Sequence, residues 1–410
     1  MAEITLVLIL IIYILTVIYS IRIRDFLNPV HIYVLSLSIG YLSYFFYYYK
    51  YKSIPVLNNQ TYLLYLLAIL SFMIGYFYLS LIFIKRSDYS KQNAIHNNNI
   101  YITVIKLFFI IGLIGFFIDL FFAFRYAITG PGSYFFNLRY ANTVEGKILY
   151  GQHLFLFFHV ATLLAIINNQ SWNIKRNKLV LLVMIWCFSS IFTMARTSLF
   201  AAIISILASY FIRYRYFEKK SKIKSKPFIL VSIFLIISFW IFGIATGKIQ
   251  ENFISTFMSY LGYPIIAFDK YILSYAGHGK GKNVFYPIIK IFNIFTNERI
   301  VPKAEIIFLE RNAFNVFTVI SDPYLDFGII GVFFIPLFLG IFYKLLYIQV
   351  RKANLLISVY YSLLLFPLII SFFEYTFKYL SWIYYAFIII ILKIFSEIYY
   401  QKKKLREIKI

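Results

Sequence analysis

The chain has 410 residues, of which 61% are hydrophobic and only 14% are charged. A soluble protein carries roughly a quarter charged residues, so this composition excludes an ordinary soluble domain. The formal net charge of +24 comes with no nucleic-acid recognition motif. We therefore assign it to the positive-inside bias of membrane proteins and to contacts with anionic membrane lipids, and we predict no nucleic-acid binding.

Apolar runs of the length that crosses ~30 Å of hydrocarbon recur along the whole chain. They predict an all-α polytopic integral membrane protein, with one membrane domain over 1–410 and about 11 transmembrane helices (10–12). The predicted spans are 4–21, 30–49, 61–84, 101–128, 151–168, 178–194, 197–213, 227–246, 324–348, 355–373 and 380–399. The first of them is too long for a signal peptide and lacks a small-residue cleavage site, so we expect it to be retained.

Basic residues mark every second loop, most strongly at 213–226. Cytoplasmic loops carry excess Lys and Arg, which places the N-terminus outside and the C-terminus inside. The apolar run 179–212 is basic at both ends and would be about 50 Å long as a single helix, too long for one span. We predict a hairpin that turns at MARTS. Its Arg196 then lies at the outer surface, either reaching lipid headgroups or serving in a site.

Two large extracytoplasmic loops are predicted, at 129–150 and at 247–322. The first contains a Gly-Pro-Gly turn and Arg139. The second is expected to be partly helical, with an apolar segment, 253–272, that lies on the membrane and breaks near Pro264. Its glycine-rich, basic stretch AGHGKGKNVFYP either is a solvated loop or wraps an anion with backbone N–H groups.

A stripe of polar residues leads into the predicted span 324–348. On a helix, spacings of 4, 3 and 4 place four polar side chains in line; they are Arg311, Asn315, Thr318 and Asp322. Asp322 precedes Pro323 and so has a structural alternative, as the N-cap of the next helix. Gly328 and Gly331 are expected to allow close helix packing. The stripe predicts a site at the membrane surface.

Few ionisable residues fall near or within the spans. Asp119 lies deep in a span, where a carboxylate is either a functional residue or part of an interhelical hydrogen bond. Glu374 and Lys378 form an i,i+4 pair at an outer turn, which we interpret as structural. The single Cys187 excludes an intramolecular disulfide and a cysteine-built metal cluster.

The histidines show no metal-ligand spacing, and no HExxH, GxSxG or Walker motif occurs. We therefore predict neither a metal nor a cofactor. What remains is a set of arginines on the predicted outer side: Arg139, Arg196, Arg299 and Arg311. The planar guanidinium suits bidentate phosphate binding, so the expected substrate is anionic, lipid-linked and presented at the outer leaflet.

The turn MARTSLF, the loop segment FNLRYAN and the stretch RNAFNVFTVISDPYLDFGIIGVFFIPLFLG resemble Wzy-type O-antigen or capsular repeat-unit polymerases. The resemblance extends to the topology, with about eleven spans and two large outer loops. It implies a multi-pass glycosyltransferase of the bacterial inner membrane, independent of metal. Such an enzyme transfers the growing glycan from undecaprenyl pyrophosphate onto an incoming lipid-linked repeat unit at the outer face. A chain-length regulator protein is a candidate partner.

On this resemblance, Arg196 and Arg311 would stabilise the charge that builds on the pyrophosphate leaving group. The residues expected to bind substrate are Arg139, Asn315, Thr318, Asp322, Asp326, Tyr263 and His278. The sequence does not rank the candidate general bases, which are Glu310, Asp269 and His278. Two other functions stay open. An O-antigen ligase would share the topology and arginines, and a lipid-linked oligosaccharide flippase or transporter would share the cationic interior.

Overall fold

The computed structural model describes residues 1–50, 56–83, 98–130, 132–143, 145, 147, 149–172, 174–193, 196–220, 237, 253–296, 307–309, 312–314 and 316–407. Within these ranges the chain is helical apart from one antiparallel β-hairpin. It folds as two compact units. Unit 1 comprises Met1–Asp88, Glu251–Ile348 and Pro367–Leu380, and unit 2 comprises Tyr89–Gln250, Gln349–Phe366 and Ser381–Ile410.

Seven described helices are long and apolar enough to cross a membrane. They are Ala2–Ile23, Pro29–Lys50, Asn59–Leu79, Thr103–Thr129, Thr197–Phe217, Ser321–Arg351 and Ser381–Ile398. Each coincides with a predicted span, which confirms an α-helical membrane protein. Two shorter apolar helices, Gln152–Ile167 and Leu355–Ile369, fall at further predicted spans. The predicted span 227–246 lies outside the described residues except for Ile237, so the total of eleven stays a prediction.

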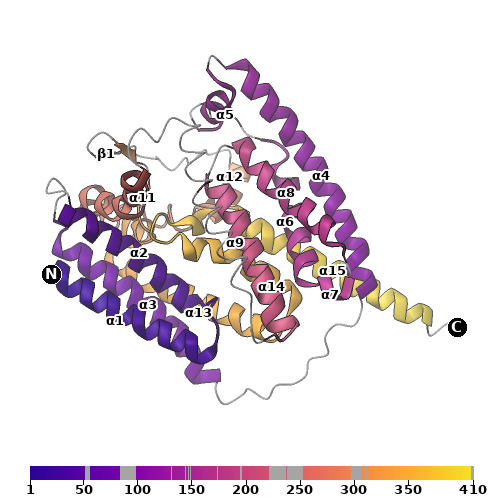
Figure 1. Ribbon diagram of the computed structural model, residues 1–410, viewed down its shortest axis with the longest axis horizontal. Coiled ribbons are helices and arrows are strands. Elements are labelled where there is room, and N and C mark those ends of the chain that lie inside the picture. The colour runs from indigo at the N-terminus through magenta and orange to yellow at the C-terminus, as the bar shows by residue number, and fades with distance from the viewer. Residues whose placement is uncertain are drawn as a thin grey trace. The chain divides into compact units, whose positions relative to one another are not determined.

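Unit 1 contains the N-terminal helices and most of the long helix that follows the predicted polar stripe (Figure 1). Its elements are α1 (Ala2–Ile23), α2 (Pro29–Lys50), α3 (Asn59–Phe83), α11 (Phe253–Ala267), α12 (Tyr286–Thr296), β1 (Ile307–Leu309), β2 (Asn312–Phe314) and most of α13 (Ser321–Arg351). Short π and 3-10 turns follow α11 at Phe268–Ile272 and Leu273–Tyr275, and a 3-10 turn lies at Thr376–Lys378.

Buried tyrosines build much of the core of unit 1. Tyr41, Tyr44 and Tyr65 have no exposed surface. Their hydroxyls still find partners: Tyr41 donates to the Ala2 carbonyl at 2.8 Å, and Tyr44 lies 3.3 Å from the Tyr62 hydroxyl. A buried tyrosine stabilises a core through its ring provided that its hydroxyl is hydrogen-bonded. The tyrosine-rich composition is therefore used for packing.

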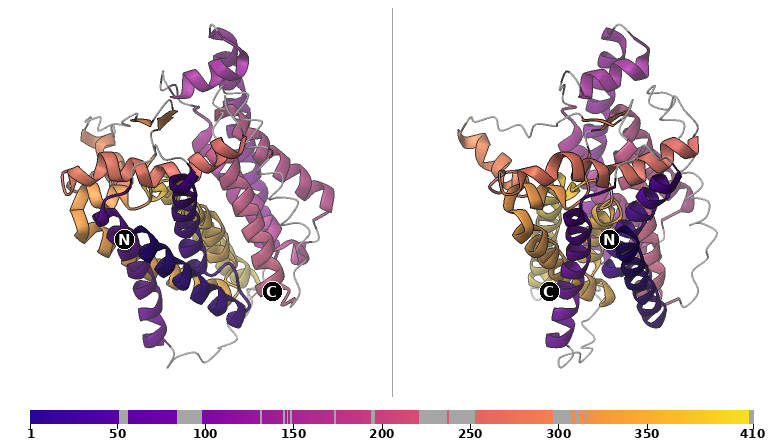
Figure 2. Two further views of the ribbon diagram at one scale, coloured as in Figure 1. Left: turned by 60° about the vertical axis from the view of Figure 1, so that its left-hand side comes forward. Right: turned by 90° about the vertical axis from the view of Figure 1, so that its left-hand side faces the viewer.

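Helix α11 runs crosswise over the indigo helices of unit 1 and packs against α2 (Figure 2). A Cβ added to Gly262 would lie 2.9 Å from the Tyr44 nitrogen, so the two backbones approach closely. The prediction that 253–272 breaks near Pro264 is wrong, because α11 continues to Ala267 and then into a π turn. Proline removes one backbone hydrogen bond, and burial of its neighbours Ile265 and Ile266 offsets that loss.

Helix α13 is interrupted at Gly328, whose φ of 62° and ψ of −144° no helix contains. Only glycine adopts this backbone conformation readily. Beyond the kink, a Cβ on Gly331 would collide with the carbonyl oxygen of Pro323. Close packing at Gly331 is thus confirmed, whereas Gly328 acts through its backbone conformation.

The polar stripe is not a helix. Strands β1 and β2 pair with Leu309 opposite Asn312, and residues 316–318 are irregular. Thr318 closes a turn instead: its hydroxyl accepts the Ile320 N–H at 3.3 Å, and its carbonyl accepts the Ser321 hydroxyl at 2.8 Å. Side chain-to-backbone bonds of this kind compete with a helix. The predicted alignment of the stripe is therefore wrong.

Unit 2 contains α4 (Asn98–Thr129), α5 (Tyr134–Thr143), α6 (Gln152–Ile167), α7 (Asn169–Trp172), α8 (Arg176–Thr193), α9 (Arg196–Ile212), a π turn at Arg213–Phe217, most of α14 (Leu355–Ile369), and α15 (Ser381–Glu407). The predicted break of this run into two helices is confirmed, because α8 and α9 are separate, contact each other and both pack against α6; residues 194 and 195 of the predicted turn lie outside the described residues. Asp119 of α4 accepts the Gly151 N–H at 2.7 Å, at the start of α6. Its predicted alternative, a hydrogen bond between helices, is confirmed.

Candidate functional site

Asn137 fixes the loop between α4 and α6, which belongs to unit 2. Its Oδ1 accepts the Gly132 N–H at 2.7 Å, within the predicted Gly-Pro-Gly turn. Its Nδ2 donates to the Ala127 carbonyl at 2.9 Å and to the Gly132 carbonyl at 3.0 Å. The side chain is only 4% exposed, so these bonds are shielded from water. One amide therefore joins the end of α4, the turn and α5.

Asn142 ties the other end of α5 to α8. Its Nδ2 donates to the Leu138 carbonyl at 3.0 Å and to the Phe192 carbonyl at 3.1 Å. Phe192 is one residue before the end of α8, where carbonyls lack a helical partner. Helix α9 then begins at Arg196. The loop helix that carries Arg139 is therefore held beside the turn that leads to Arg196.

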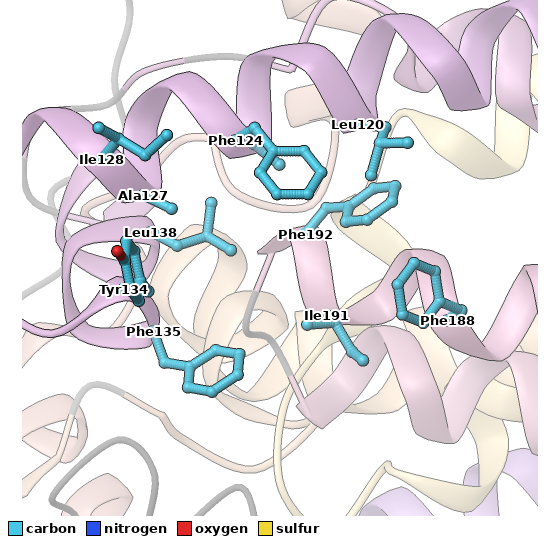
Figure 3. A pocket seen from close by; sticks show the side chains of 11 residues that line it. Leu120, Phe124, Ala127, Ile128, Tyr134, Phe135, Leu138, Phe188, Ile191 and Phe192 are labelled. Atoms are coloured by element: carbon cyan, nitrogen blue, oxygen red, sulfur yellow. The ribbon is translucent and has the colours of Figure 1, made fainter.

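A pocket of about 360 Å³ lies between α4, α5 and α8 (Figure 3). Apolar side chains form almost all of its lining: Leu120, Ala123, Phe124, Ala127, Ile128, Tyr134, Phe135, Leu138, Phe188, Ile191 and Phe192. Tyr134, Phe135 and Leu138 come from one face of α5 and point toward α4 and α8. The volume is within the ~300–1,000 Å³ that small-molecule sites occupy. The pocket suits a hydrocarbon chain.

Arg139 lies next to one of the residues that line this pocket. It follows Phe135 by four residues on α5, so the two side chains are neighbours on the helix surface. Arg139 is partly exposed, whereas Leu138 beside it is buried. A guanidinium next to an apolar pocket is the arrangement that an amphiphilic anion requires. The side chain of Arg196 is outside the described residues, although its backbone begins α9.

In unit 1, Asp322 belongs to a network that the sequence did not indicate. Lys378 lies with its Nζ 3.1 Å from Asp322 Oδ2 and 3.3 Å from Glu374 Oε1. Tyr379 donates its hydroxyl to Glu374 Oε2 at 2.8 Å. Burial alone would lower the pKa of Lys378, but the two carboxylates outweigh it and raise the pKa above its ordinary value. Lys378 therefore stays charged at neutral pH.

Asp322 is not the N-cap of α13. The helix begins at Ser321, and the Tyr324 N–H bonds to the Ile320 carbonyl at 3.0 Å, so the cap position is Ile320. The ion pair with Lys378 explains why the Asp322 carboxylate is buried, at 7% exposed. The predicted pair of Glu374 and Lys378 is present, and it is extended by Asp322.

Asp326 binds the glycine-rich loop. Its Oδ2 accepts the Val284 N–H at 2.7 Å and the Asn283 N–H at 3.0 Å, and its Oδ1 accepts Asn283 Nδ2 at 2.8 Å. Gly279 donates its N–H to the Leu325 carbonyl at 2.8 Å and leaves no room for a Cβ beside Asp326. The loop does wrap an anion with backbone N–H groups, as one of the two interpretations has it. That anion is the protein's own carboxylate.

The other predicted residues are distributed as follows. Thr318 is fully buried in its turn, and Tyr263 is buried with its ring 5.6 Å from that of Tyr47. His278 is exposed in the loop that Asp326 holds. Among the candidate bases, Asp269 accepts hydrogen bonds from the Asn58 N–H and the Thr61 hydroxyl. Arg311, Asn315, Arg299 and Glu310 lie outside the described residues.

Sequence reasoning missed the two amides of α5 and the link between Asp322 and Lys378. The only local signal was the turn sequence Gly130-Pro131-Gly132, which predicts a bend but no partner for Asn137. Over the described ranges, no group of three or more His, Cys, Asp or Glu side chains is arranged to hold a metal ion. Comparison with protein-family models, curated proteins and solved structures finds no match to this chain.

Proposed function

We propose that this protein is a bacterial oligosaccharide repeat-unit polymerase. It transfers the growing glycan from undecaprenyl pyrophosphate onto a lipid-linked repeat unit at the outer face of the inner membrane. The observation that carries the proposal is the apolar pocket between α4, α5 and α8, bordered by Arg139 and close to the start of α9. A polyprenyl pyrophosphate needs both an apolar surface and cations that bind its head group.

The proposed reaction is a displacement at the anomeric carbon of the donor. An acceptor sugar hydroxyl forms the new glycosidic bond while the bond to pyrophosphate breaks, and the hydroxyl proton passes to a base or to the departing phosphate. Negative charge therefore builds on the pyrophosphate. Arginines that are already in place bind this charge more tightly in the transition state than in the ground state. We assign this role to Arg196 and Arg311, and binding of the pyrophosphate to Arg139.

The two asparagines of α5 support this assignment through their hydrogen bonds. Asn137 and Asn142 hold α5 at both of its ends, so Arg139 is presented from a fixed helix and not from a free loop. Catalytic groups need such support, because errors of about 1 Å in placement are costly. Charge bias places this end of α4 at the outer surface, where the lipid-linked substrates would be presented.

The test is the glycan profile of a strain that lacks this gene. A polymerase mutant is expected to carry a single repeat unit on each lipid A core, because ligation continues without polymerisation. A profile without any repeat unit would contradict the proposal and indicate an O-antigen ligase or a flippase. Complementation with an Arg139→Ala variant is expected to restore chains poorly, whereas Arg125→Ala on the exposed surface of α4 is expected to restore them fully.

A further inference from the structure

The loop before α12 is fastened to the start of α13. Gly277 donates its N–H to the Tyr324 carbonyl at 3.2 Å, and Gly279 donates to the Leu325 carbonyl at 2.8 Å. Asp326 accepts the Val284 N–H at 2.7 Å. Together with the two bonds from Asn283 to Asp326, five hydrogen bonds connect this loop to one turn of α13.

That turn lies where α13 enters the membrane. Asp326 is the last charged residue before an uncharged apolar run from Phe327 to Tyr343. Helix rise places it about 8 Å from the start of α13. The first residue of the run is Phe327, and the centroid of its ring lies 6.1 Å from that of the Phe285 ring. Phe285, the residue before α12, is therefore held near the point where the apolar run of α13 begins.

An exposed apolar face begins at the same point. Phe285 is 45% exposed, Ile288 is 47% exposed and Phe292 is 64% exposed. Their spacing of three and four residues puts them on one side of α12. Phe285 belongs to this face because its carbonyl accepts the Ile288 and Ile289 N–H groups at 3.0 Å, which makes it the cap of the helix.

Three exposed lysines lie in and before α12, close in sequence to this apolar face. Lys280 and Lys282 are exposed in the fastened loop, and Lys290 is exposed on α12, where it lies 5.9 Å from the Tyr286 ring. None of the three forms an ion pair with another described residue. An apolar helix face with uncompensated cations beside it is the pattern of a helix that lies in a lipid–water interface.

We propose that α12 and the loop 277–284 form an interfacial anchor on the outer leaflet. Phe285, Ile288 and Phe292 insert at the boundary between headgroups and acyl chains, and Lys280 and Lys282 bind the phosphates of anionic lipids. The role is independent of the proposed polymerase activity, since it depends only on the membrane and on α13 as a span. It is separate from the membrane-surface segment expected at 253–272, whose helix α11 packs on α2.

The test measures lipid contact of the full chain in nanodiscs, in a Cys187→Ser background. A fluorophore is placed at Phe292→Cys, with Ile288→Cys as a second site and Lys290→Cys as the control on another side of α12. A nitroxide on the lipid acyl chain is expected to quench the probes at 288 and 292 at least about threefold more than the probe at 290. Iodide in the water is expected to show the opposite order.

A comparison of anionic with zwitterionic lipid separates the contribution of the lysines from that of the apolar face. Lys280→Ala with Lys282→Ala is expected to reduce the lipid quenching at 292 about twofold in anionic nanodiscs and to leave it unchanged in zwitterionic ones. Equal quenching at 290 and 292 by iodide would overturn the anchor. Protection of 288 and 292 from both quenchers would also overturn it, because another protein surface or a glycan would then cover this face. Neither readout depends on glycan synthesis.

Discussion

At the scale of single residues, several buried polar side chains hold segments of the fold together. Asn137, Asp119 and Asp326 have side-chain polar atoms that are hydrogen-bonded to the backbone of neighbouring turns or helices. A buried polar group without such partners would cost about 1–3 kcal/mol. Arg139 differs in being partly exposed at the edge of an apolar pocket. Among the described arginines, Arg139 is the one for which we propose a substrate role.

Alanine substitutions of the two proposed catalytic arginines test whether these residues stabilise the charge on the pyrophosphate leaving group. Arg196→Ala and Arg311→Ala are each expected to remove roughly 2–4 kcal/mol of transition-state stabilisation, about 30-fold to several hundred-fold in rate. Arg→Lys should recover only part of the rate, because a point charge replaces a planar fork. The rate is measured with purified lipid-linked repeat units. Arg299→Ala is the control, and a severe defect there with normal activity in Arg311→Ala would reverse the assignment.

Replacing Lys378 tests the buried ion network. Lys378→Met leaves Asp322 and Glu374 without their cation and is expected to cost about 3 kcal/mol of stability. Lys378→Met with Asp322→Asn should recover part of this loss. The control is Lys393→Met in the exposed pair of Lys393 and Glu397, whose charged atoms are 3.9 Å apart. This substitution should have almost no effect on stability. Melting temperatures in detergent give the result, and equal shifts at the two sites would contradict it.

The pH dependence of this network follows from the sign of the shift. The pKa of Lys378 is raised in the folded protein. Its contribution to the free energy of unfolding is therefore fully present below the ordinary lysine pKa, and it is lost as the pH rises through the pKa that Lys378 has in the folded protein. The difference in melting temperature between the wild type and Lys378→Met should therefore be constant from about pH 6 to 9. A difference that disappears within this range would mean that Lys378 is not the stabilising cation.

At the scale of elements, two short helices owe their positions to single side chains. Helix α5 is held by Asn137 and Asn142, and the loop before α12 is held by Asp326. Neither helix is long enough to be stable alone in water, since isolated helices below about 12–15 residues are marginal. Their order depends on the attachments, which makes the attachments good targets for mutation.

Asn137→Ala is expected to loosen α5. It removes three hydrogen bonds of a 4% exposed side chain, and we expect a local cost of about 2–3 kcal/mol. Amide hydrogen exchange in α5 should accelerate about 30-fold or more while exchange in α6 is unchanged. Activity should fall in the same direction as in Arg139→Ala. Asn293→Ala, on α12, is the control. Unchanged exchange in α5 would show that the amide is dispensable.

Two glycines of the fastened loop provide a matched pair. Gly279→Ala places a Cβ against Asp326 and Asn283, so it should disrupt the attachment and cost about 2–3 kcal/mol. Gly277→Ala has open space around it and is strained only by its φ of 74°, which costs about 1 kcal/mol. Exchange of the Asn283 and Val284 amides measures both. A larger effect at Gly277 would contradict the contact with Asp326.

At the scale of the whole molecule, the charge bias predicts which ends of the helices face the cytoplasm. Single cysteines in a Cys187→Ser background test this prediction. Ser133→Cys and Asn283→Cys should react with an impermeant reagent in intact cells, whereas Ser221→Cys should react only after permeabilisation. Labelling of position 221 in intact cells would invert the topology and move α5 and the pocket to the cytoplasmic side.

The sequence alone determined the class of the protein and the location of its described spans. Hydropathy is a local property, and a segment of about 20 apolar residues must be helical in lipid because its backbone has no other partners there. For the same reason the helix break between α8 and α9 was predictable from its length and flanking charges. The basic flanks also supplied an orientation, which stays a prediction.

Only the tertiary structure decided how the polar groups are used. Four residues at helical spacing predicted a stripe before α13, but strand pairing of Ile307–Leu309 with Asn312–Phe314 and the turn at Thr318 prevent a helix there. Asp322 meets Lys378, and Asp326 meets the loop at Asn283, across long separations in sequence. Such pairings depend on which segments pack together, and local spacing carries no information about them.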